Sequence, residues 1–353
     1  MNPNSNTLSM MSDEVDGFSD LVLKTRFAKA LEEGFSRYPI FRELRFAARI
    51  ELEVLFDALA LEPAWRAVRL GAERLVLDGD GVFIGAAGTR NADYCSCDFD
   101  IWASDIATVE AAKQSILEKV GSTRITEPMF SIDWHFSLSG GGVQHASVEE
   151  LASDVLHDRA YPEIKGGVGN FIHRYLDAPE TVLVLQGPPG TGKTRLIRAI
   201  LGAISRRKGE QAEVIYTGDA KALASDALFV KFITGYHDAF VIEDADHLLK
   251  PRTDGNQHLH RFLAIADGVV RAQGRKIIFS TNLPNVGDLD DALIRPGRCF
   301  ARLQVRALTA AEARALAEEI AAGDVEKKAR ASFALAADGA RKRSLAEVYA
   351  ALR

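Results

Sequence analysis

The stretch that decides the fold reads Thr181-Val-Leu-Val-Leu-Gln-Gly-Pro-Pro-Gly-Thr-Gly-Lys-Thr-Arg-Leu-Ile-Arg-Ala-Ile-Leu201. Its first six residues form an apolar run typical of a strand buried on both faces of a parallel sheet. Its last seven residues have the apolar spacing of a helix. The eight residues between them match the pattern G-x-x-x-x-G-K-[ST] of a phosphate-binding loop, in the strand, loop and helix context that this motif requires. They are Gly187, Pro188, Pro189, Gly190, Thr191, Gly192, Lys193 and Thr194.

The chemistry of a phosphate site explains this choice of residues. Glycines let backbone N–H groups wrap phosphate oxygens where a side chain would collide, and the following helix presents its positive end to the same oxygens. The Lys193 ammonium is expected to neutralise the β- and γ-phosphates, and the Thr194 hydroxyl to ligate Mg²⁺. The loop therefore predicts binding of a nucleotide polyphosphate with Mg²⁺.

Two further strands end in polar side chains of the kind that such a site needs. The run Ala239-Phe-Val-Ile-Glu-Asp244 closes on an acidic pair, and Lys276-Ile-Ile-Phe-Ser-Thr-Asn282 closes on an amide. The segment Asp290-Asp-Ala-Leu-Ile-Arg-Pro-Gly-Arg298 follows shortly after. Carboxylates at the end of a neighbouring strand would hold the metal and the attacking water near the γ-phosphate.

This ordered set of motifs resembles the AAA family of ATPases over roughly residues 160–350. The resemblance implies an α/β fold, with a parallel sheet between helices and a C-terminal helical lid, and ATP and Mg²⁺ as cofactors. It makes Gly187 to Thr194 the Walker A loop and Asn282 the sensor-1 residue that orients water. Thr194 and Glu243 would serve the metal, and Asp244 would act as the general base.

The same resemblance places Arg295 and Arg298 at arginine-finger positions, which reach into the site of the next subunit. A guanidinium stabilises charge on the γ-phosphoryl group in the transition state, and supplying it from a neighbour couples hydrolysis to subunit geometry. The chain is therefore expected to form a homo-oligomeric ring, a hexamer or heptamer.

Two departures from the family pattern narrow the resemblance. The acidic pair reads Glu243-Asp244, whereas most members have Asp-Glu, so the assignment of the residue that polarises water stays open between the two. In the segment 217–238, the predicted helical part from Ala222 to Phe229 lacks the aromatic-hydrophobic-Gly element with which threading members grip unfolded chains, and Tyr236, a weak substitute, is expected to pack or end a turn. The ATPase looks closest to the branch that contains the mitochondrial Rieske-protein translocase, without that protein's membrane anchor.

The front part of the chain predicts a smaller α+β module. Apolar residues between Phe18 and Leu70 recur at three and four and indicate two or three helices, and Leu75 to Ile84 indicates a hairpin turning on Asp-Gly. A strand from Cys95 to Ile101, a helix from Val109 to Val120 and a strand from Phe130 to Leu138, with its even-numbered residues facing the core, complete the module.

The glycine-dense run 139–143 marks the predicted domain boundary, and residues 144–178 are expected to be helical. We therefore predict three parts. Residues 1–143 form an N-terminal α+β domain for client binding or assembly, residues 144–306 the AAA nucleotide-binding core, and residues 307–353 the helical lid.

Composition limits the kind of protein and its partners. The 353 residues are 47% hydrophobic and 26% charged, three cysteines make no disulfide framework, and no apolar run spans a bilayer. Without a secretory signal, a cytoplasmic location with no membrane partner is expected. Residues 1–155 hold 14 basic against 25 acidic residues and residues 156–353 hold 29 against 24, which argues against nucleic acid binding by the acidic part.

Several weaker signals have simpler interpretations. Cys95 and Cys97 make a poor zinc pair and are expected in a core, and His258 and His260 are expected in a solvated loop. Asp98 and Asp100 lie on the polar face of a predicted strand. A sensor-2 arginine is left open among the basic residues that precede the last helix, which are Arg341, Lys342 and Arg343.

The sequence thus favours a ring-forming AAA ATPase that uses ATP hydrolysis to remodel an unidentified protein client. Two alternatives use the same core: a nucleic-acid-associated loader or motor, and a slowly hydrolysing nucleotide-dependent scaffold. The loader predicts ATPase stimulation by DNA or RNA with steep salt dependence, whereas the scaffold predicts nucleotide-dependent assembly with negligible turnover.

Overall fold

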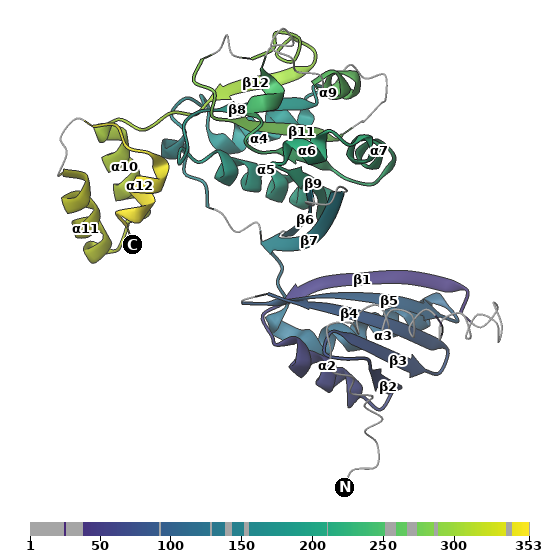
Figure 1. The fold of residues 1–353 in the computed structure, drawn as a ribbon. Helices are drawn as coiled ribbons and strands as arrows, with labels where there is room; N and C mark the ends of the chain where they lie inside the picture. Colours follow the sequence, from purple (N-terminus) through teal and green to yellow (C-terminus); the bar gives the residue numbers. More distant parts are fainter. Residues whose placement is uncertain are drawn as a thin grey trace. The chain divides into compact units, whose positions relative to one another are not determined.

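The computed structural model describes residues 25, 38–91, 93–127, 129–137, 143–151, 155–209, 211–250, 259–266, 274–285, 289–336 and 341–352. The chain divides into two compact units, residues 1–126 and 127–353 (Figure 1). Across the described ranges, no helix combines the length and the apolar character needed to cross a bilayer. Most of the predicted helices between Phe18 and Tyr38 fall outside the described residues.

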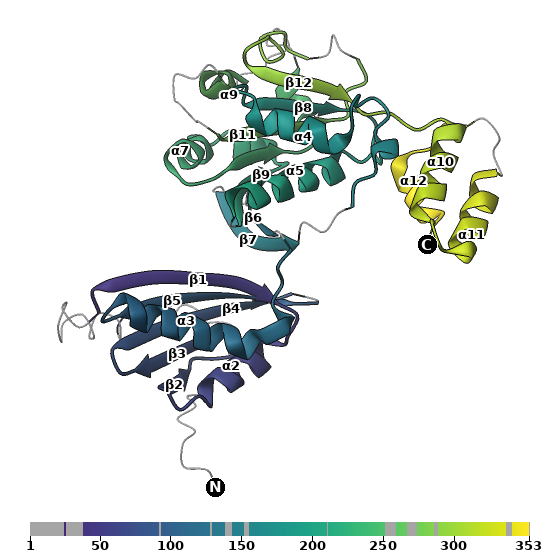
Figure 2. The same cartoon turned by 180° about the vertical axis from the view of Figure 1, so that it is seen from behind.

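The first unit is a five-stranded antiparallel sheet in the order β1-β5-β4-β3-β2, with two helices on one face (Figure 2). Its elements are β1 (Ile40–Ala48), α2 (Leu52–Ala60), β2 (Trp65–Arg69), β3 (Arg74–Gly79), β4 (Val82–Arg90), β5 (Cys95–Ala103) and α3 (Ile106–Val120). The predicted hairpin, β5 and α3 are confirmed, and Cys95 and Cys97 are buried in the core between sheet and helices. Asp98 is half-exposed and pairs with Arg45 at 3.0 Å.

One prediction for this unit was wrong, because residues 40–48 form strand β1 and not a helix. The apolar residues Leu44, Phe46 and Ala48 are also spaced by two, and all three pack into the same core. The whole strand pairs antiparallel with β5, from Ile40 opposite Ala103 to Ala48 opposite Cys95. Pairing with β5 therefore outweighed the helical spacing from which the sequence predicted helices in this region.

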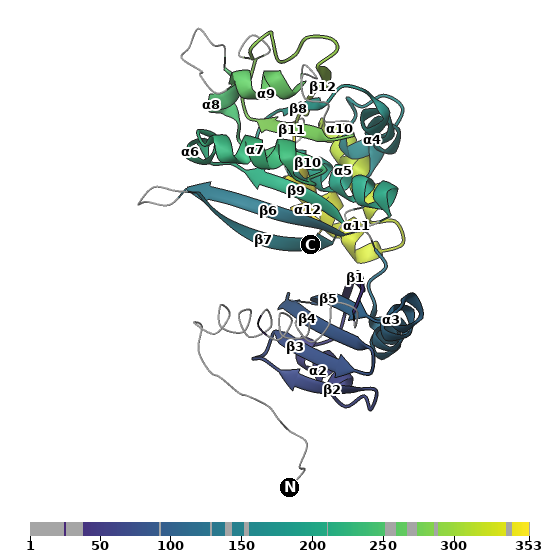
Figure 3. The same cartoon turned by 90° about the vertical axis from the view of Figure 1, so that its right-hand side faces the viewer.

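The second unit is built on a seven-stranded sheet in the order β12-β8-β11-β10-β9-β6-β7, in which neighbouring strands run parallel except for the antiparallel pair β6 and β7 (Figure 3). Its strands are β6 (Met129–Ser137), β7 (Val143–Leu151), β8 (Val182–Gln186), β9 (Ala212–Thr217), β10 (Ala239–Ile242), β11 (Lys276–Thr281) and β12 (Cys299–Gln304). The expected α/β fold with a central parallel sheet is confirmed.

Helices cover both faces of this sheet. On one face lie α4 (Val168–Asp177) and α5 (Lys193–Lys208), together with packing from the C-terminal helices. On the other lie α6 (Ala220–Leu223), α7 (Asp226–Thr234), α8 (Asp246–Leu249) and α9 (Leu259–Ala266). The segment predicted to be a helical lid, residues 307–353, contains helices α10 (Ala310–Ile320), α11 (Val325–Ala336) and α12 (Leu345–Ala350).

The predicted boundary at residues 139–143 was wrong. Strand β6 belongs to the large sheet, where Trp134 pairs in register with Tyr216 of β9, and the chain divides after Thr126. Residues 143–151 form strand β7, and among the described residues of the expected helical region only 168–177 form an α-helix. A glycine-rich run serves a hairpin as well as it serves a domain linker, so its composition does not distinguish the two.

The two faces of β6 also differ from the prediction. Trp134 and Phe136, expected in the core, are 49% and 36% exposed, whereas His135 is buried. Asp133, expected to face away from the core, accepts a 2.6 Å ion pair from Lys231 of α7. Phe130 is buried in the core and Ile132 packs against it, so the prediction fails only in the second half of the strand.

Candidate functional site

The phosphate-binding loop lies where the sequence predicts it, between the carboxyl end of β8 and the first turn of α5. Two of its glycines are required by close contacts. A Cβ at Gly187 would collide with the carbonyl oxygen of Val305, and one at Gly192 would lie 2.5 Å from Leu345 Cδ2. Gly192 also has φ +95° as the N-cap of α5, a conformation that favours glycine. The loop therefore tolerates no side chain at either position.

Lys193 is held inside the loop. Its Nζ donates to the carbonyl oxygens of Gly187 at 2.7 Å and Pro188 at 3.1 Å, and to Asn282 Oδ1 at 2.9 Å. Burial lowers the pKa of Lys193, and the nearby carboxylates of Asp244 and Glu243 act in the opposite direction. A positive charge is thus placed at the centre of the loop, where phosphate oxygens would bind.

The acidic pair follows the carboxyl end of β10 and faces α5. Glu243 Oε1 accepts a 2.5 Å hydrogen bond from Thr194 Oγ1, and Glu243 Oε2 accepts a 2.7 Å bond from the Tyr216 hydroxyl of β9. Asp244 has φ +49° and is the only non-glycine residue with positive φ in the described part of the chain. Strained backbone of this kind concentrates at functional sites.

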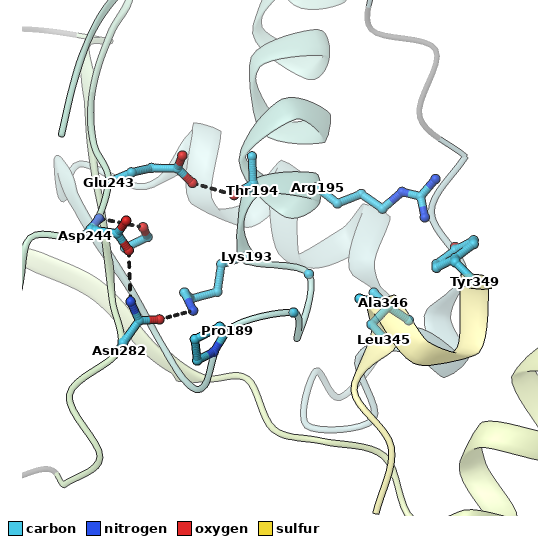
Figure 4. Close-up of a pocket in the computed structure, with 13 residues that line it drawn as sticks. Pro189, Lys193, Thr194, Arg195, Glu243, Asp244, Asn282, Leu345, Ala346 and Tyr349 are labelled. Carbon is cyan, nitrogen blue, oxygen red and sulfur yellow. Dashed lines mark hydrogen bonds between the residues drawn. The ribbon is translucent and has the colours of Figure 1, made fainter. Parts of the chain in front are cut away.

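Asn282, at the end of β11, joins the two halves of the site. Its Oδ1 accepts from Lys193 Nζ, and its Nδ2 donates to Asp244 Oδ1 at 2.9 Å (Figure 4). Asp246 in turn holds Asn282: Asp246 Oδ1 accepts from the Asn282 N–H at 2.8 Å and from Thr281 Oγ1 at 2.5 Å. The side chains of Lys193, Asn282 and Asp244 form one network, and Asp246 supports it through the Asn282 main chain.

A pocket of about 460 Å³ opens over this network, a size in the range of small-molecule sites. One wall is formed by the loop and the acidic pair, and the other by Leu345, Ala346 and Tyr349 of α12 (Figure 4). The Ala346 N–H donates to the Gly190 carbonyl at 3.0 Å, so the lid contacts the loop directly. The Arg195 guanidinium lies 4.0 Å from the centroid of the Tyr349 ring.

The basic residues before α12 do not line this pocket in the described part of the chain. Arg341 donates to Glu347 Oε1 at 3.0 Å, and Arg343 lies 3.9 Å from the same oxygen. Glu347 completes a capping box with Ser344 at the start of α12. Arg341 and Arg343 therefore support the capped end of the lid helix, and the sensor-2 hypothesis has no support among them.

Arg295 and Arg298 lie far from the loop of their own chain. They precede β12, whose first residue Cys299 pairs with Val182 at the amino end of β8, whereas the loop follows the carboxyl end of β8. The five residues of β8 separate the beginning of the strand, next to the arginines, from its end, next to the loop, by about 16 Å. Arg295 is exposed, and Arg298 donates to the Ala292 carbonyl at 2.9 Å. An intramolecular role at this pocket is therefore disfavoured.

The donor set fits magnesium. The Thr194 hydroxyl and the Glu243 carboxylate meet at 2.5 Å at the γ-phosphate side of the loop, and Asp244 lies on the same edge. Magnesium in nucleotide sites takes one or two protein oxygens and completes its shell with phosphates and water. No cluster of three or more His, Cys, Asp and Glu side chains occurs in the described ranges, which is compatible with a site that the nucleotide completes.

The remaining weak signals have structural outcomes. Phe229 is buried among aromatic residues, whereas Tyr236 is 92% exposed and precedes the amino end of β10, at the sheet edge opposite the loop. The alternative that Tyr236 packs was therefore wrong. His260 lies exposed on α9, and His258 falls outside the described residues.

Comparison with known proteins agrees with this geometry. Residues 183–307 match the model of the ATPase family associated with various cellular activities (AAA), and this span contains the loop, the acidic pair, Asn282 and both arginines. The chain therefore contains an AAA ATPase domain, as expected. The resemblance to the branch of the Rieske-protein translocase stays a prediction.

Three relatives from different organisms illustrate the match. An ATP-dependent zinc metalloprotease YME1 homolog of Caenorhabditis elegans is 34% identical over 137 residues, covering 36% of this chain and 18% of that protein. The human peroxisomal ATPase PEX6 is 25% identical over 234 residues, 63% and 22% of the two chains. A proteasome-activating nucleotidase of Pyrococcus furiosus is 32% identical over 178 residues, 46% and 41%. The chain thus spans less than half the length of each of these proteins.

Proposed function

Because residues 183–307 are an AAA ATPase domain, we propose that the chain is a ring-forming ATPase that uses ATP hydrolysis to remodel a protein client. The observation that carries this proposal is the network in which Lys193, Asn282 and Asp244 meet at the rim of one pocket. It places a cation, an amide and a carboxylate where phosphoryl transfer to water needs them.

Each of these three side chains has a separate task in hydrolysis. Lys193 neutralises phosphate charge, Asn282 orients the attacking water, and Asp244 accepts the proton of that water. The open side of the pocket admits ATP and the water. Thr194 and Glu243 would hold Mg²⁺, which when bound would neutralise negative charge on the phosphates. Asp244 is assigned the base role because its Oδ1 is held by Asn282, whereas both Glu243 oxygens already bond to Thr194 and Tyr216.

The position of the arginines supports assembly. The arginines lie at the end of the sheet where the parallel strands begin, whereas the phosphate-binding loop lies where the strands end. Such a guanidinium therefore serves catalysis only in the site of a neighbouring chain. We assign that task to Arg295, which is exposed, and the support of its loop to Arg298, which bonds to Ala292. Repetition of this head-to-tail contact closes into a ring.

A mixing experiment tests the shared site. Lys193→Ala and Arg295→Ala chains should each be inactive alone, because one lacks the phosphate cation and the other the arginine for its neighbour. In an equal mixture a site is complete only when an Arg295→Ala chain lies beside a Lys193→Ala chain, so about a quarter of wild-type turnover should return. No recovery, or full activity of a dilute monomer, would contradict assembly.

The client proposal rests on charge and on the relatives. The acidic front part disfavours nucleic acid, and two of the relatives are named for proteolysis: a metalloprotease and a proteasome activator. We therefore assign residues 1–126 to holding a protein client or to assembly. Stimulation of ATP turnover by DNA or RNA, lost steeply with salt, would instead support the loader, and nucleotide-dependent assembly with negligible turnover would support the scaffold.

A further inference from the structure

The β6–β7 hairpin reaches the candidate site through a pair of aromatic rings. Trp134 of β6 lies opposite Tyr216 of β9, with ring centroids 5.5 Å apart and the rings edge to face at 84°. The Tyr216 hydroxyl then donates its 2.7 Å hydrogen bond to Glu243 Oε2. Two side chains from neighbouring strands, Trp134 of β6 and Tyr216 of β9, thus connect the hairpin to Glu243, the acidic residue assigned to the metal.

The two oxygens of Glu243 have different donors. Thr194 of α5 holds Oε1, and Tyr216 of β9 holds Oε2. A glutamate has one more rotatable bond than an aspartate, so its carboxylate needs a second fixed partner to keep one orientation. Tyr216 supplies that partner at the position where most AAA members have the shorter residue.

We propose that Tyr216 is a positioning residue for Mg²⁺-dependent ATP binding: its hydroxyl holds the Glu243 carboxylate against Thr194, and Trp134 holds the Tyr216 ring. This inference rests on the proposed ATPase function of the same site. It gives the β6–β7 hairpin, which the motifs of the ATPase core do not include, a direct effect on the metal side of the pocket.

The ring of Trp134 packs edge to face against the ring of Tyr216, whose hydroxyl donates to Glu243. Trp134 is 49% exposed, so its ring shields one side of the tyrosine from water without burying the pair completely. The hydrogen bond from Tyr216 to Glu243 is therefore partly shielded from solvent by the Trp134 ring.

Equilibrium binding of a fluorescent ATP analogue, measured with EDTA and across a Mg²⁺ titration, tests this role without measuring turnover. Tyr216→Phe keeps the ring and removes only the donor, so the Kd in EDTA should match wild type. The Mg²⁺ concentration for half-maximal tightening should rise about tenfold, since a hydrogen bond to a charged group is lost. If Tyr216 were only structural, Tyr216→Phe would change the Kd in EDTA as well as the Mg²⁺ midpoint.

Two further comparisons keep the test specific. Trp134→Leu should raise the same Mg²⁺ midpoint by a smaller factor, about threefold, whereas Phe136→Leu, two residues further along the same face, should leave it unchanged. In a Glu243→Asp background the carboxylate is one methylene shorter and no longer reaches the hydroxyl. Adding Tyr216→Phe should then produce no additional shift.

The outcomes separate this inference from the proposed function. If Tyr216→Phe leaves the Mg²⁺ midpoint at the wild-type value, or weakens binding equally in EDTA, Tyr216 does not position Glu243. An additive effect in the Glu243→Asp background would contradict it as well. If instead wild type and Lys193→Ala bind the analogue equally, the nucleotide site itself is misassigned and the proposed function fails.

Discussion

Asp246 is a residue whose removal tests how the site is held together. It lies in the first turn of α8 and touches no atom expected to react, yet its Oδ1 accepts hydrogen bonds from Thr281 Oγ1 and the Asn282 N–H. Asp246→Ala removes the single oxygen that accepts both bonds and releases the backbone from which the Asn282 amide reaches Lys193 and Asp244. We expect the orientation of the attacking water to suffer more than ATP binding.

The size of the effect follows from the two bonds. A hydrogen bond to a charged group contributes about 1.5–3 kcal/mol, but Asp246 is only half-buried, so water replaces part of both. A net loss of about 2 kcal/mol in transition-state stabilisation corresponds to roughly a 30-fold lower kcat. Asp246→Asn keeps an acceptor oxygen at the same position and should stay within about threefold of wild type.

Steady-state phosphate release over a range of ATP concentrations separates the two parameters. The expected pattern is a reduced kcat with little change in KM for Asp246→Ala, and nearly normal values for Asp246→Asn. Asn282→Ala provides the reference for complete loss of the water-orienting amide. If Asp246→Ala retained the wild-type kcat while Asn282→Ala lost it, the reasoning about support of Asn282 would be refuted.

Other predictions concern the loop, a buried lysine and the mode of work. Gly187→Ala should abolish ATP binding in equilibrium dialysis with the circular dichroism spectrum preserved, because the new methyl group collides with the Val305 carbonyl; normal binding would contradict it. Burial lowers the pKa of Lys276 to about 8, so the unfolded chain binds this proton more tightly, and stability to urea should rise from pH 8 to 10 in wild type but not in Lys276→Met. A client fused to a very stable domain should be remodelled with that domain still protease-resistant, because neither aromatic residue is placed to grip an unfolded chain: Phe229 is buried, and Tyr236 precedes the amino end of β10, opposite the loop. ATP-dependent unfolding of the domain, abolished by Tyr236→Ala without loss of ATPase activity, would indicate threading.

The parts predicted correctly depend on local sequence. Strand β8, the loop and α5 are contiguous in the sequence. The strand is apolar because it is fully buried, Gly187 is glycine because a Cβ would collide with Val305, and α5 begins at Lys193. The ends of β10 and β11 were found for the same reason, because parallel strands bring their carboxyl ends to one edge of the sheet.

The parts predicted wrongly depend on partners far along the chain. Strand β6 alternates clearly in the sequence, but only its pairing with β9, about 80 residues later, assigns it to the larger sheet and exposes Trp134. Residues 40–48 likewise form strand β1 through pairing with β5, about 50 residues later in the chain. Periodicity identifies a strand without saying which sheet it joins.

Tyr216 and Asp246 were missed for a related reason. Neither belongs to a spacing pattern, and their contribution comes from contacts to Glu243 and Asn282 that the fold creates. A weak signal existed for Asp246, which follows the acidic pair by two residues and is the first residue of α8. The glutamate in place of the usual aspartate was a signal that a second partner such as Tyr216 would be required.

The measurement that tests the central claim most directly is ATP turnover by Asp244→Asn at saturating Mg²⁺ and ATP. Asparagine tolerates the positive φ of this position and keeps a side chain of the same shape, so the site should stay folded and bind ATP. Removing the general base should lower turnover by about 10²-fold or more relative to wild type. Turnover equal to wild type would contradict the assignment of Asp244 and, with it, the account of hydrolysis at this site.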